Sequence, residues 1–279
     1  MGVETNVEMA DGRTVHVYDN AQPGDPTALT VFWHHGTPQT GLPPEPLLTT
    51  ASAQPIRWVG HDRPGYRSSS PLRGRDVAAV AADVAAIADH LGIARFAVAG
   101  VSGGGPHALA CAALLPRRVQ AVVCVASTAP HEAPGLDWYR GMVESNAAEL
   151  RAAAQGRAPL HAHLTGEHEL DPAMFAPADL DALGGAYGPW LRSTTAAALA
   201  GGLDGHLDDD LALVNPWGFA VADIRQPVLV LHGEHDRLVP TAHARWLTDR
   251  CPAADLRLYP DDGHISIIGR LAAAMDWLD

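Results

Sequence analysis

Lysine is absent from the 279-residue sequence, and charged residues of any kind make up only 18% of it. Acidic residues outnumber basic ones by 32 to 19, which gives a formal net charge of −13 at pH 7. An acidic surface repels nucleic-acid phosphates and anionic lipid head groups. We therefore expect neither nucleic acid nor a membrane surface as a partner.

Cysteine and long apolar runs are also scarce. The three cysteines, Cys111, Cys124 and Cys251, are an odd number in segments that we expect to be buried, so we expect no disulfide framework. No apolar run approaches membrane-spanning length, and residues 1–15 lack the basic start and apolar core of a secretory signal. The Met-Gly start fails the myristoylation motif because Asn6 replaces the required Ser or Thr. We expect a cytoplasmic protein.

Apolar strand-like runs alternate with helix-like segments through much of the chain, in which 47% of residues are hydrophobic. Asp11-Gly12 predicts the turn of an N-terminal hairpin. Further strands are predicted at residues 28–35, 56–62, 95–101, 119–127, 227–233 and 255–260, and the main helices at residues 75–92, 104–116, 241–251 and 264–278. Such alternation is typical of a mainly parallel sheet covered by helices on both faces. The sequence therefore predicts an α/β fold.

The alternation stops between residues 129 and 223, where strand-like runs vanish and aromatic residues stand among Gly, Pro and Asp. We interpret residues 129–223 as a mostly helical insertion with long loops. Residues 1–128 and 224–279 then form one core domain around the insertion. A chain of this length is long enough to bury the hydrophobic core of such a domain.

Ser102 lies in Gly100-Val101-Ser102-Gly103-Gly104, between a predicted strand and a predicted helix. This G-x-S-x-G pattern is typical of a sharp turn that exposes a nucleophilic serine at a helix N-terminus. The segment also fits G-x-G-x-x-A, a dinucleotide-binding fingerprint, but the following strand ends in Ala126-Ser127 without the acid that would bind a ribose. We favour the nucleophile.

A serine hydroxyl needs a base, and that base needs an orienting acid. Asp236 follows the predicted strand at 227–233, and His264 follows the one at 255–260. Because active sites gather at the carboxyl ends of parallel strands, we expect Ser102, Asp236 and His264 to form a catalytic triad in the chain order of this motif. Glu234 competes with Asp236 in the same turn, and Glu132 is a poor candidate after residues 119–127.

A tetrahedral intermediate needs two donors for its oxyanion. We expect the backbone amides of Gly103 and of Thr37, in the segment His34-His35-Gly36-Thr37-Pro38, to supply them. His34 and His35 are expected to order this loop. Asp62 and Arg63 are expected to hold it as a hydrogen-bonded pair.

Together, "HHGTP", "DRPGYRSS", "GVSGGG", "GEHDRLVP" and "DDGH" resemble the α/β-hydrolase fold family over nearly the whole chain. They are more similar to esterase-like and perhydrolase-like members than to lipases. The resemblance implies a sheet of eight strands with a helical cap inserted after the sixth. Arg67 departs from the family, whose loop usually has glycine there; it could narrow the pocket mouth or pair with an acid.

The expected cap holds His161, His163, Glu167, His168 and Glu169, which we interpret as solvated loop residues, so no metal site and no cofactor is predicted. Four of its side chains are candidates for binding substrate, although packing is an alternative for each. They are Trp138, Tyr139, Met142 and Trp190.

The sequence thus predicts a serine hydrolase, a carboxylesterase acting on a small ester through an acyl-enzyme on Ser102. Lactone, amide, thioester or carbon–carbon hydrolysis and perhydrolysis would use the same residues. Halide displacement and epoxide opening use a carboxylate nucleophile in this fold, so Ser102 argues against both. A sensor that binds a small apolar ligand with little turnover is the alternative from another class. The sequence leaves open whether the protein forms a homo-oligomer.

Overall fold

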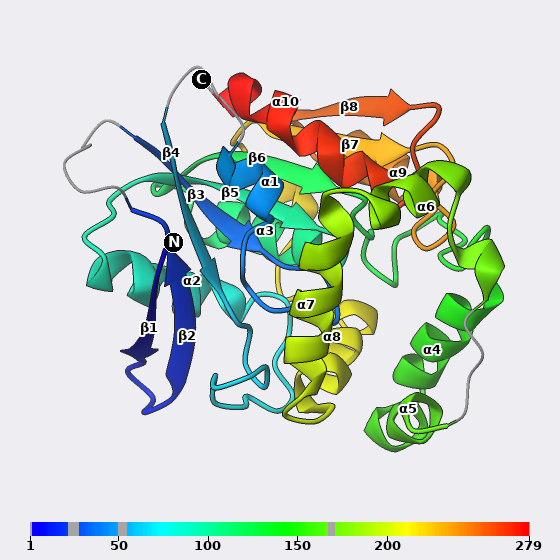
Figure 1. Ribbon diagram of the computed structural model, residues 1–279, viewed down its shortest axis with the longest axis horizontal. Coiled ribbons are helices and arrows are strands. Elements are labelled where there is room, and N and C mark those ends of the chain that lie inside the picture. The colour runs from blue at the N-terminus through cyan, green and yellow to red at the C-terminus, as the bar shows by residue number, and fades with distance from the viewer. Residues whose placement is uncertain (1, 22–27, 50–54, 167–170, 279) are drawn as a thin grey trace.

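The computed structural model describes residues 2–21, 28–49, 55–166 and 171–278, and within them eight strands form one sheet (Figure 1). The strands are β1 (Val3–Glu8), β2 (Thr14–Asp19), β3 (Leu29–His34), β4 (Ile56–His61), β5 (Phe96–Val101), β6 (Val119–Val125), β7 (Val228–Gly233) and β8 (Ala254–Tyr259). Their order is β1-β2-β4-β3-β5-β6-β7-β8. The β1–β2 and β2–β4 pairs are antiparallel, and the other neighbours are parallel. The predicted eight-stranded, mainly parallel sheet is confirmed.

The N-terminal hairpin turns where the Asp11-Gly12 signal predicts it. Met9 N donates to Arg13 O over 2.8 Å, and Gly12 has φ +83°, a backbone conformation that favours glycine. The hairpin extends the sheet beyond β4, at the edge farther from β8.

Helices cover both faces of the sheet because side chains alternate along each strand. Phe32, Val98 and Val122 lie in the core cluster that includes residues of α2 (Val80–His90), α3 (Gly104–Leu114) and α9 (Thr241–Arg250). Their neighbours Val31 and Ala97 lie in the opposite cluster with residues of α1 (Glu45–Thr49), α7 (Tyr187–Leu199) and α10 (Leu271–Met275).

The segment between β6 and β7, residues 126–227, is called the insertion below. It contains α4 (Glu144–Ala154), α5 (Arg157–Leu164), α6 (Pro177–Gly184), α7, α8 (Asp204–Val214) and the 3₁₀ turns η1 (Pro172–Met174) and η2 (Val221–Asp223). No strand forms in its described residues. Trp138, Leu150 and Leu207 belong to a separate small apolar cluster within it. No helix in the described part of the chain is both long and apolar enough to cross a membrane.

The C-terminal segment differs from the single helix predicted over residues 264–278. A 3₁₀ helix η3 (Ser266–Arg270) comes first, followed by α10 and a final turn η4 (Asp276–Leu278). The amides of His264, Ile265 and Ser266 all donate to the carboxylate of Asp179. These bonds hold residues 264 and 265 as a loop, so helical structure starts only at Ser266.

Candidate active site

Ser102 occupies the turn between β5 and α3, at the carboxyl edge of the parallel strands. Its φ is +52°, a left-handed conformation that is strained for a residue with a side chain. Ser102 N donates to Val125 O over 2.8 Å, and Gly105 N donates to Ser102 O over 3.0 Å. These backbone bonds fix the turn, and the half-buried serine stands directly before the N-terminus of α3.

The glycines around Ser102 are needed because backbone segments approach each other closely there. A Cβ on Gly100 would lie 2.4 Å from Gly104 O, and one on Gly104 would lie 2.1 Å from His34 O. Both distances are far below van der Waals contact, so no larger residue fits without moving the backbone. The G-x-S-x-G pattern therefore reflects a steric requirement of this turn.

Asp236 and His264, which follow β7 and β8, are hydrogen-bonded to each other. His264 Nδ1 lies 2.8 Å from Asp236 Oδ2, and both side chains are buried. Asp236 Oδ1 accepts from the amides of Leu238 and Val239 over 2.9 and 2.8 Å. His232 Nε2 lies 3.4 Å from Asp236 Oδ2. The carboxylate is thus fixed from several sides, with one oxygen presented to His264.

Electrostatics favour the imidazolium form of His264. Burial by itself would lower the pKa of His264, but the adjacent Asp236 and the more distant charge of Asp179 raise it above the ordinary value. Burial would raise the pKa of Asp236, but the charges and hydrogen bonds of His264 and His232 lower it. Asp236 therefore stays ionised and stabilises a proton on His264.

The Ser102 hydroxyl makes no hydrogen bond to any residue that the structure describes. Hydrogen bonds between a nucleophile and its base are often long in free enzymes and shorten when substrate binds. The open hydroxyl is therefore compatible with a base at His264, on the same edge of the sheet.

Thr37 and Gly103, the predicted oxyanion donors, lie next to each other. A Cβ built on Gly103 would come within 2.6 Å of Thr37 Oγ1. The Arg63 guanidinium anchors the Thr37 loop, donating to His35 O over 2.6 Å and to Gly36 O over 3.2 Å. The loop is thereby held against the turn that carries Ser102.

Asp209 on α8 of the insertion is a second anchor of that loop. It is fully buried, and its two oxygens accept from Arg63, Arg75, Tyr66 and Thr37 at distances between 2.5 and 2.8 Å. Burial alone would raise the pKa of Asp209, but the two guanidinium groups hold it well below the usual value. The carboxylate remains charged and links the insertion to the Thr37 loop.

Asp179 on α6 of the insertion anchors the opposite side of the site. This fully buried carboxylate accepts from His264 N over 3.1 Å and from Ile265 N and Ser266 N over 2.8 Å each. Ser266 Oγ adds a bond of 2.9 Å. A Cβ on Gly263 would lie 2.2 Å from Asp179 Oδ2, so the loop needs glycine at that position. Asp179 therefore fixes the backbone of the loop that carries His264.

Of the two histidines expected to order the Thr37 loop, His35 does so, whereas His34 Nε2 lies 3.7 Å from Cys111 Sγ on α3. His35 Nδ1 bonds Gly36 O over 2.7 Å, and burial lowers the pKa values of His34 and His35 well below the ordinary value. Asp62 and Arg63, however, do not form the predicted pair.

Asp62 accepts instead from Gly41 N over 2.6 Å and from the Tyr18 hydroxyl over 3.2 Å. Arg63 pairs with Asp209. The prediction was wrong because Arg63 finds its carboxylate on the insertion, 146 positions away, and Asp62 is occupied by a neighbouring loop.

Arg67 points toward the N-terminal hairpin. Its Nη1 donates to the Tyr18 hydroxyl over 2.6 Å and lies 3.8 Å from Glu4. Its φ is +46°, which explains why glycine suits this position. Arg67 is expected either to narrow the pocket mouth or to pair with an acid, and its contact with Glu4 favours the second role.

The four candidate substrate-binding residues occupy different surroundings. Trp138 is buried in the insertion's apolar cluster and donates from Nε1 to Ala129 O, while Tyr139 and Met142 are half-buried beside that cluster. Trp190 packs against Trp33 on the face of the sheet that α7 and α10 cover, and its Nε1 donates to Leu42 O. All four have packing partners, and their contact with a substrate stays a prediction.

Sequence reasoning missed Asp179, Asp209, Arg75 and His232. His232 and Arg75 had local signals, since His232 is the next-to-last residue of β7 and Arg75 opens the predicted helix at 75–92. The two aspartates had none, because they lie in irregularly patterned sequence and their partners are far along the chain.

Comparison with known proteins gives a consistent assignment. The alpha/beta hydrolase fold profile matches residues 30–271. A pimeloyl-[acyl-carrier protein] methyl ester esterase of Nitrosomonas europaea is 32% identical over 76% of this chain and 79% of its own length. A bifunctional esterase/perhydrolase of Acinetobacter calcoaceticus is 25% identical over 78% of each chain.

Solved structures share the fold. A thermophilic esterase from Thermogutta terrifontis superposes with a TM-score of 0.71 at 19% identity, over 100% of this chain and 98% of that one. The sheet, the profile and the esterase relatives agree. The chain belongs to the α/β-hydrolase fold family, and both relatives described above are named as esterases.

Proposed function

We propose that the protein is a serine carboxylesterase that cleaves a small ester through an acyl-enzyme on Ser102. The supporting observation is the buried His264–Asp236 pair, joined over 2.8 Å, at the sheet edge where Ser102 occupies a strained turn. A serine held in this way before a helix N-terminus, with an oriented imidazole at the same edge of the sheet, is suited to acyl transfer.

The reaction begins when Ser102 Oγ attacks the ester carbonyl and His264 Nε2 takes the hydroxyl proton. Asp236 keeps the other nitrogen, Nδ1, protonated and stabilises the imidazolium. The amides of Thr37 and Gly103 donate to the carbonyl oxygen as it becomes an oxyanion. His264 then passes its proton to the departing alkoxide, which leaves as an alcohol.

Deacylation repeats the sequence with water as the nucleophile. His264 takes a proton from water as its oxygen attacks the acyl carbon, and the carboxylic acid is released as Ser102 regains its proton. We also propose that residues 129–223 cap this site, because Asp179 and Asp209 tie the insertion to its two loops. The methyl ester named for the relative at 32% identity makes small methyl esters the first substrates to test.

Replacement of the nucleophile tests the proposal. Turnover of p-nitrophenyl acetate and of small methyl esters should fall about 10⁶-fold in Ser102→Ala. Circular dichroism should stay unchanged. Near-normal turnover by this variant would end the proposal. Stoichiometric acylation of the unmodified protein without repeated turnover would favour the ligand sensor.

Perhydrolysis is a second candidate, favoured by the similarity to the bifunctional esterase/perhydrolase. Hydrogen peroxide would replace water in deacylation, so the acyl-enzyme would yield a peracid and free Ser102. Peracid formation from acetate and hydrogen peroxide, measured by bromide oxidation, tests it. Loss of peracid formation in Ser102→Ala would assign the activity to the same site. If the unmodified protein forms no peracid, perhydrolysis is rejected as a function.

A further inference from the structure

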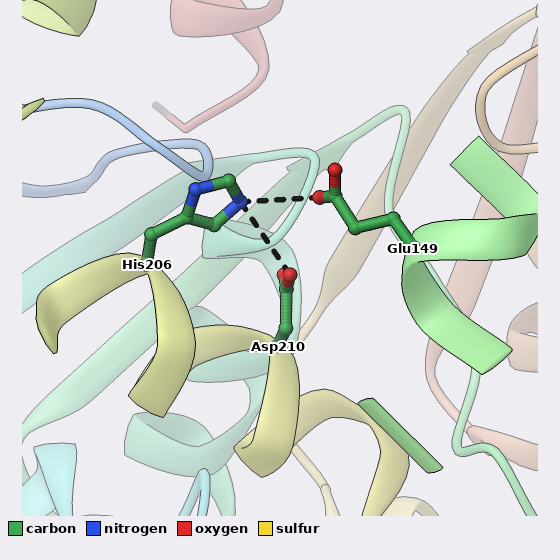
Figure 2. Close-up of side chains that lie close together, drawn as sticks. All are labelled: Glu149, His206 and Asp210. Atoms are coloured by element: carbon green, nitrogen blue, oxygen red, sulfur yellow. Dashed lines mark hydrogen bonds and ion pairs between the residues drawn. The ribbon is translucent and has the colours of Figure 1, made fainter. Parts of the chain in front are cut away.

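Three potential metal ligands meet within the insertion, where α4 lies against α8 (Figure 2). His206 Nε2 lies 3.1 Å from Glu149 Oε1 and 3.4 Å from Asp210 Oδ2. His206 and Asp210 are four residues apart on α8, so they share one face of the helix. Glu149 reaches the same point from α4, and the three ligand atoms all lie within 4.8 Å of one another.

An unsatisfied oxygen points into this cluster. Asp210 is only 3% exposed, yet its Oδ2 has no hydrogen-bond partner among the described residues. A buried carboxylate oxygen without a well-formed hydrogen bond is costly, and the 3.4 Å contact of this oxygen with His206 Nε2 does not have hydrogen-bond geometry. His206 is also buried at 8% exposure, while Glu149 is half-buried. The cluster therefore combines a shielded interior with one partly exposed side.

The spacing of the ligand atoms suits a small divalent cation. Zinc binds imidazole nitrogen and carboxylate oxygen at about 2.0–2.2 Å, so neighbouring ligands in a tetrahedron are roughly 3.3–3.6 Å apart. The separations of His206 Nε2 from Glu149 Oε1 and Asp210 Oδ2, 3.1 and 3.4 Å, are close to this range. One neutral imidazole and two carboxylates would also balance a charge of +2, which leaves no net charge in the buried space.

We propose that Glu149, His206 and Asp210 form a binding site for one divalent transition-metal cation, of which zinc is the probe of choice. The ion would join α4 to α8 and stabilise the insertion. The site is separate from the proposed reaction and draws on none of its residues. It also differs from the cluster weighed in the sequence, of which Glu167, His168 and Glu169 lie outside the described residues.

The competing arrangement is an imidazolium shared between two carboxylates. Burial would lower the pKa of His206, but Asp210 and Glu149 raise it to about 9, so a proton can occupy the position of the cation. Burial and the charge of Glu149 also raise the pKa of Asp210 well above its usual value, so a metal would have to displace a proton from each of His206 and Asp210. Direct binding measurements distinguish the two arrangements.

Calorimetric titration of the chelator-treated, full-length protein with zinc chloride tests the proposal. We expect one equivalent to bind with a micromolar or lower Kd, and zinc to raise the Tm. His206→Ala should weaken this binding roughly 100-fold or more and abolish the Tm shift, because one of three ligands is lost. The control is His161→Ala, which removes an exposed histidine of α5 and should leave both results unchanged.

A second measurement needs no variant. Cobalt added to the unmodified protein should give the visible absorption of a four-coordinate ion, and zinc should abolish it. The proposal is overturned if the protein binds no stoichiometric zinc. Equal binding by unmodified protein and His206→Ala would also overturn it. If His206→Ala does not fold, Asp210→Asn replaces it, with the same expected loss.

Discussion

Two carboxylates of the insertion, Asp179 on α6 and Asp209 on α8, are both fully buried and both bind a loop of the candidate active site. In Figure 1, α6 lies toward the start of the C-terminal segment, whereas α8 lies near the opposite end of α7. Asp179 binds the His264 loop, and Asp209 binds the Thr37 loop. The insertion therefore holds two loops of the candidate site, one through each carboxylate.

The partners of the two carboxylates differ. Asp209 faces two buried guanidinium groups, from Arg63 and Arg75, so opposite charges compensate each other. Asp179 is bound by four backbone amides and the Ser266 hydroxyl, with no cation in hydrogen-bonding contact among the described residues. The buried charge of Asp209 therefore mainly stabilises the fold, while that of Asp179 mainly positions the backbone of His264.

The largest expected effect follows from removing the charge of Asp209. In Asp209→Asn, both arginines stay buried without a carboxylate, and we expect the free energy of unfolding to fall by about 3–5 kcal/mol. Urea denaturation measures this loss. Asp181→Asn, at an exposed position of α6, is the control and should change stability by less than about 0.5 kcal/mol. An equally small loss in Asp209→Asn would show that this carboxylate does not stabilise the fold by compensating the two arginines.

The next largest effect concerns catalysis. In Asp179→Asn, the side-chain NH₂ group faces backbone N–H donors, so the His264 loop must shift. Because a displacement of about 1 Å can cost roughly 100-fold in rate, we expect kcat/KM for a p-nitrophenyl ester to fall by about that factor. Urea denaturation should show a smaller stability loss than in Asp209→Asn. If Asp179→Asn loses as much stability as Asp209→Asn while its folded fraction keeps full activity, Asp179 is not a positioning residue.

A smaller effect is expected at the hydroxyl that bonds Asp179. Ser266 Oγ donates to Asp179 over 2.9 Å and accepts from Gly263 N over 2.8 Å. Ser266→Ala removes both bonds but leaves the three loop amides on the carboxylate. We expect the free energy of unfolding to fall by about 1 kcal/mol. Thermal melting of Ser266→Ala and of Ser266→Thr, which keeps the hydroxyl, measures this loss of stability. Equal Tm values for the two variants would show that the hydroxyl does not stabilise the fold.

The smallest effect is a shift in pH dependence. His264 must be neutral to accept a proton, and the negative charges of Asp236 and Asp179 raise its pKa. Asp179→Asn removes one of these charges, so the pKa of His264 falls and the acid limb of kcat/KM moves to lower pH. A purely structural defect would lower the whole profile without moving this limb. An unmoved limb would therefore contradict the electrostatic role.

The strand-and-helix order, the turn at Ser102 and the Asp236–His264 pair were predictable because each has a local signature. A strand that is buried on both faces is continuously apolar, and the polar residue that follows it lies at the edge where such sites form. The glycines near Ser102 are required by contacts within a few residues or with the adjacent strand. Short-range sequence information therefore suffices for the core.

The insertion could not be predicted in the same way. Asp179 meets His264 across 85 positions, and Asp209 meets Arg63 across 146. Nothing near either aspartate distinguishes it from a solvated acid, and the predicted Asp62–Arg63 pair was wrong for the same reason. The Glu149–His206–Asp210 cluster likewise depends on the packing of α4 against α8. Contacts set by tertiary packing leave no periodic trace in the sequence.

In the proposed mechanism, Ser102 is the nucleophile that His264 and Asp236 activate. Intact-mass analysis after treatment with a fluorophosphonate, followed by peptide mapping, tests it most directly. We expect a single adduct on Ser102 that forms much more slowly in His264→Ala and not at all in Ser102→Ala. A protein that hydrolyses esters while Ser102 stays unlabelled, or that is labelled elsewhere, would contradict it.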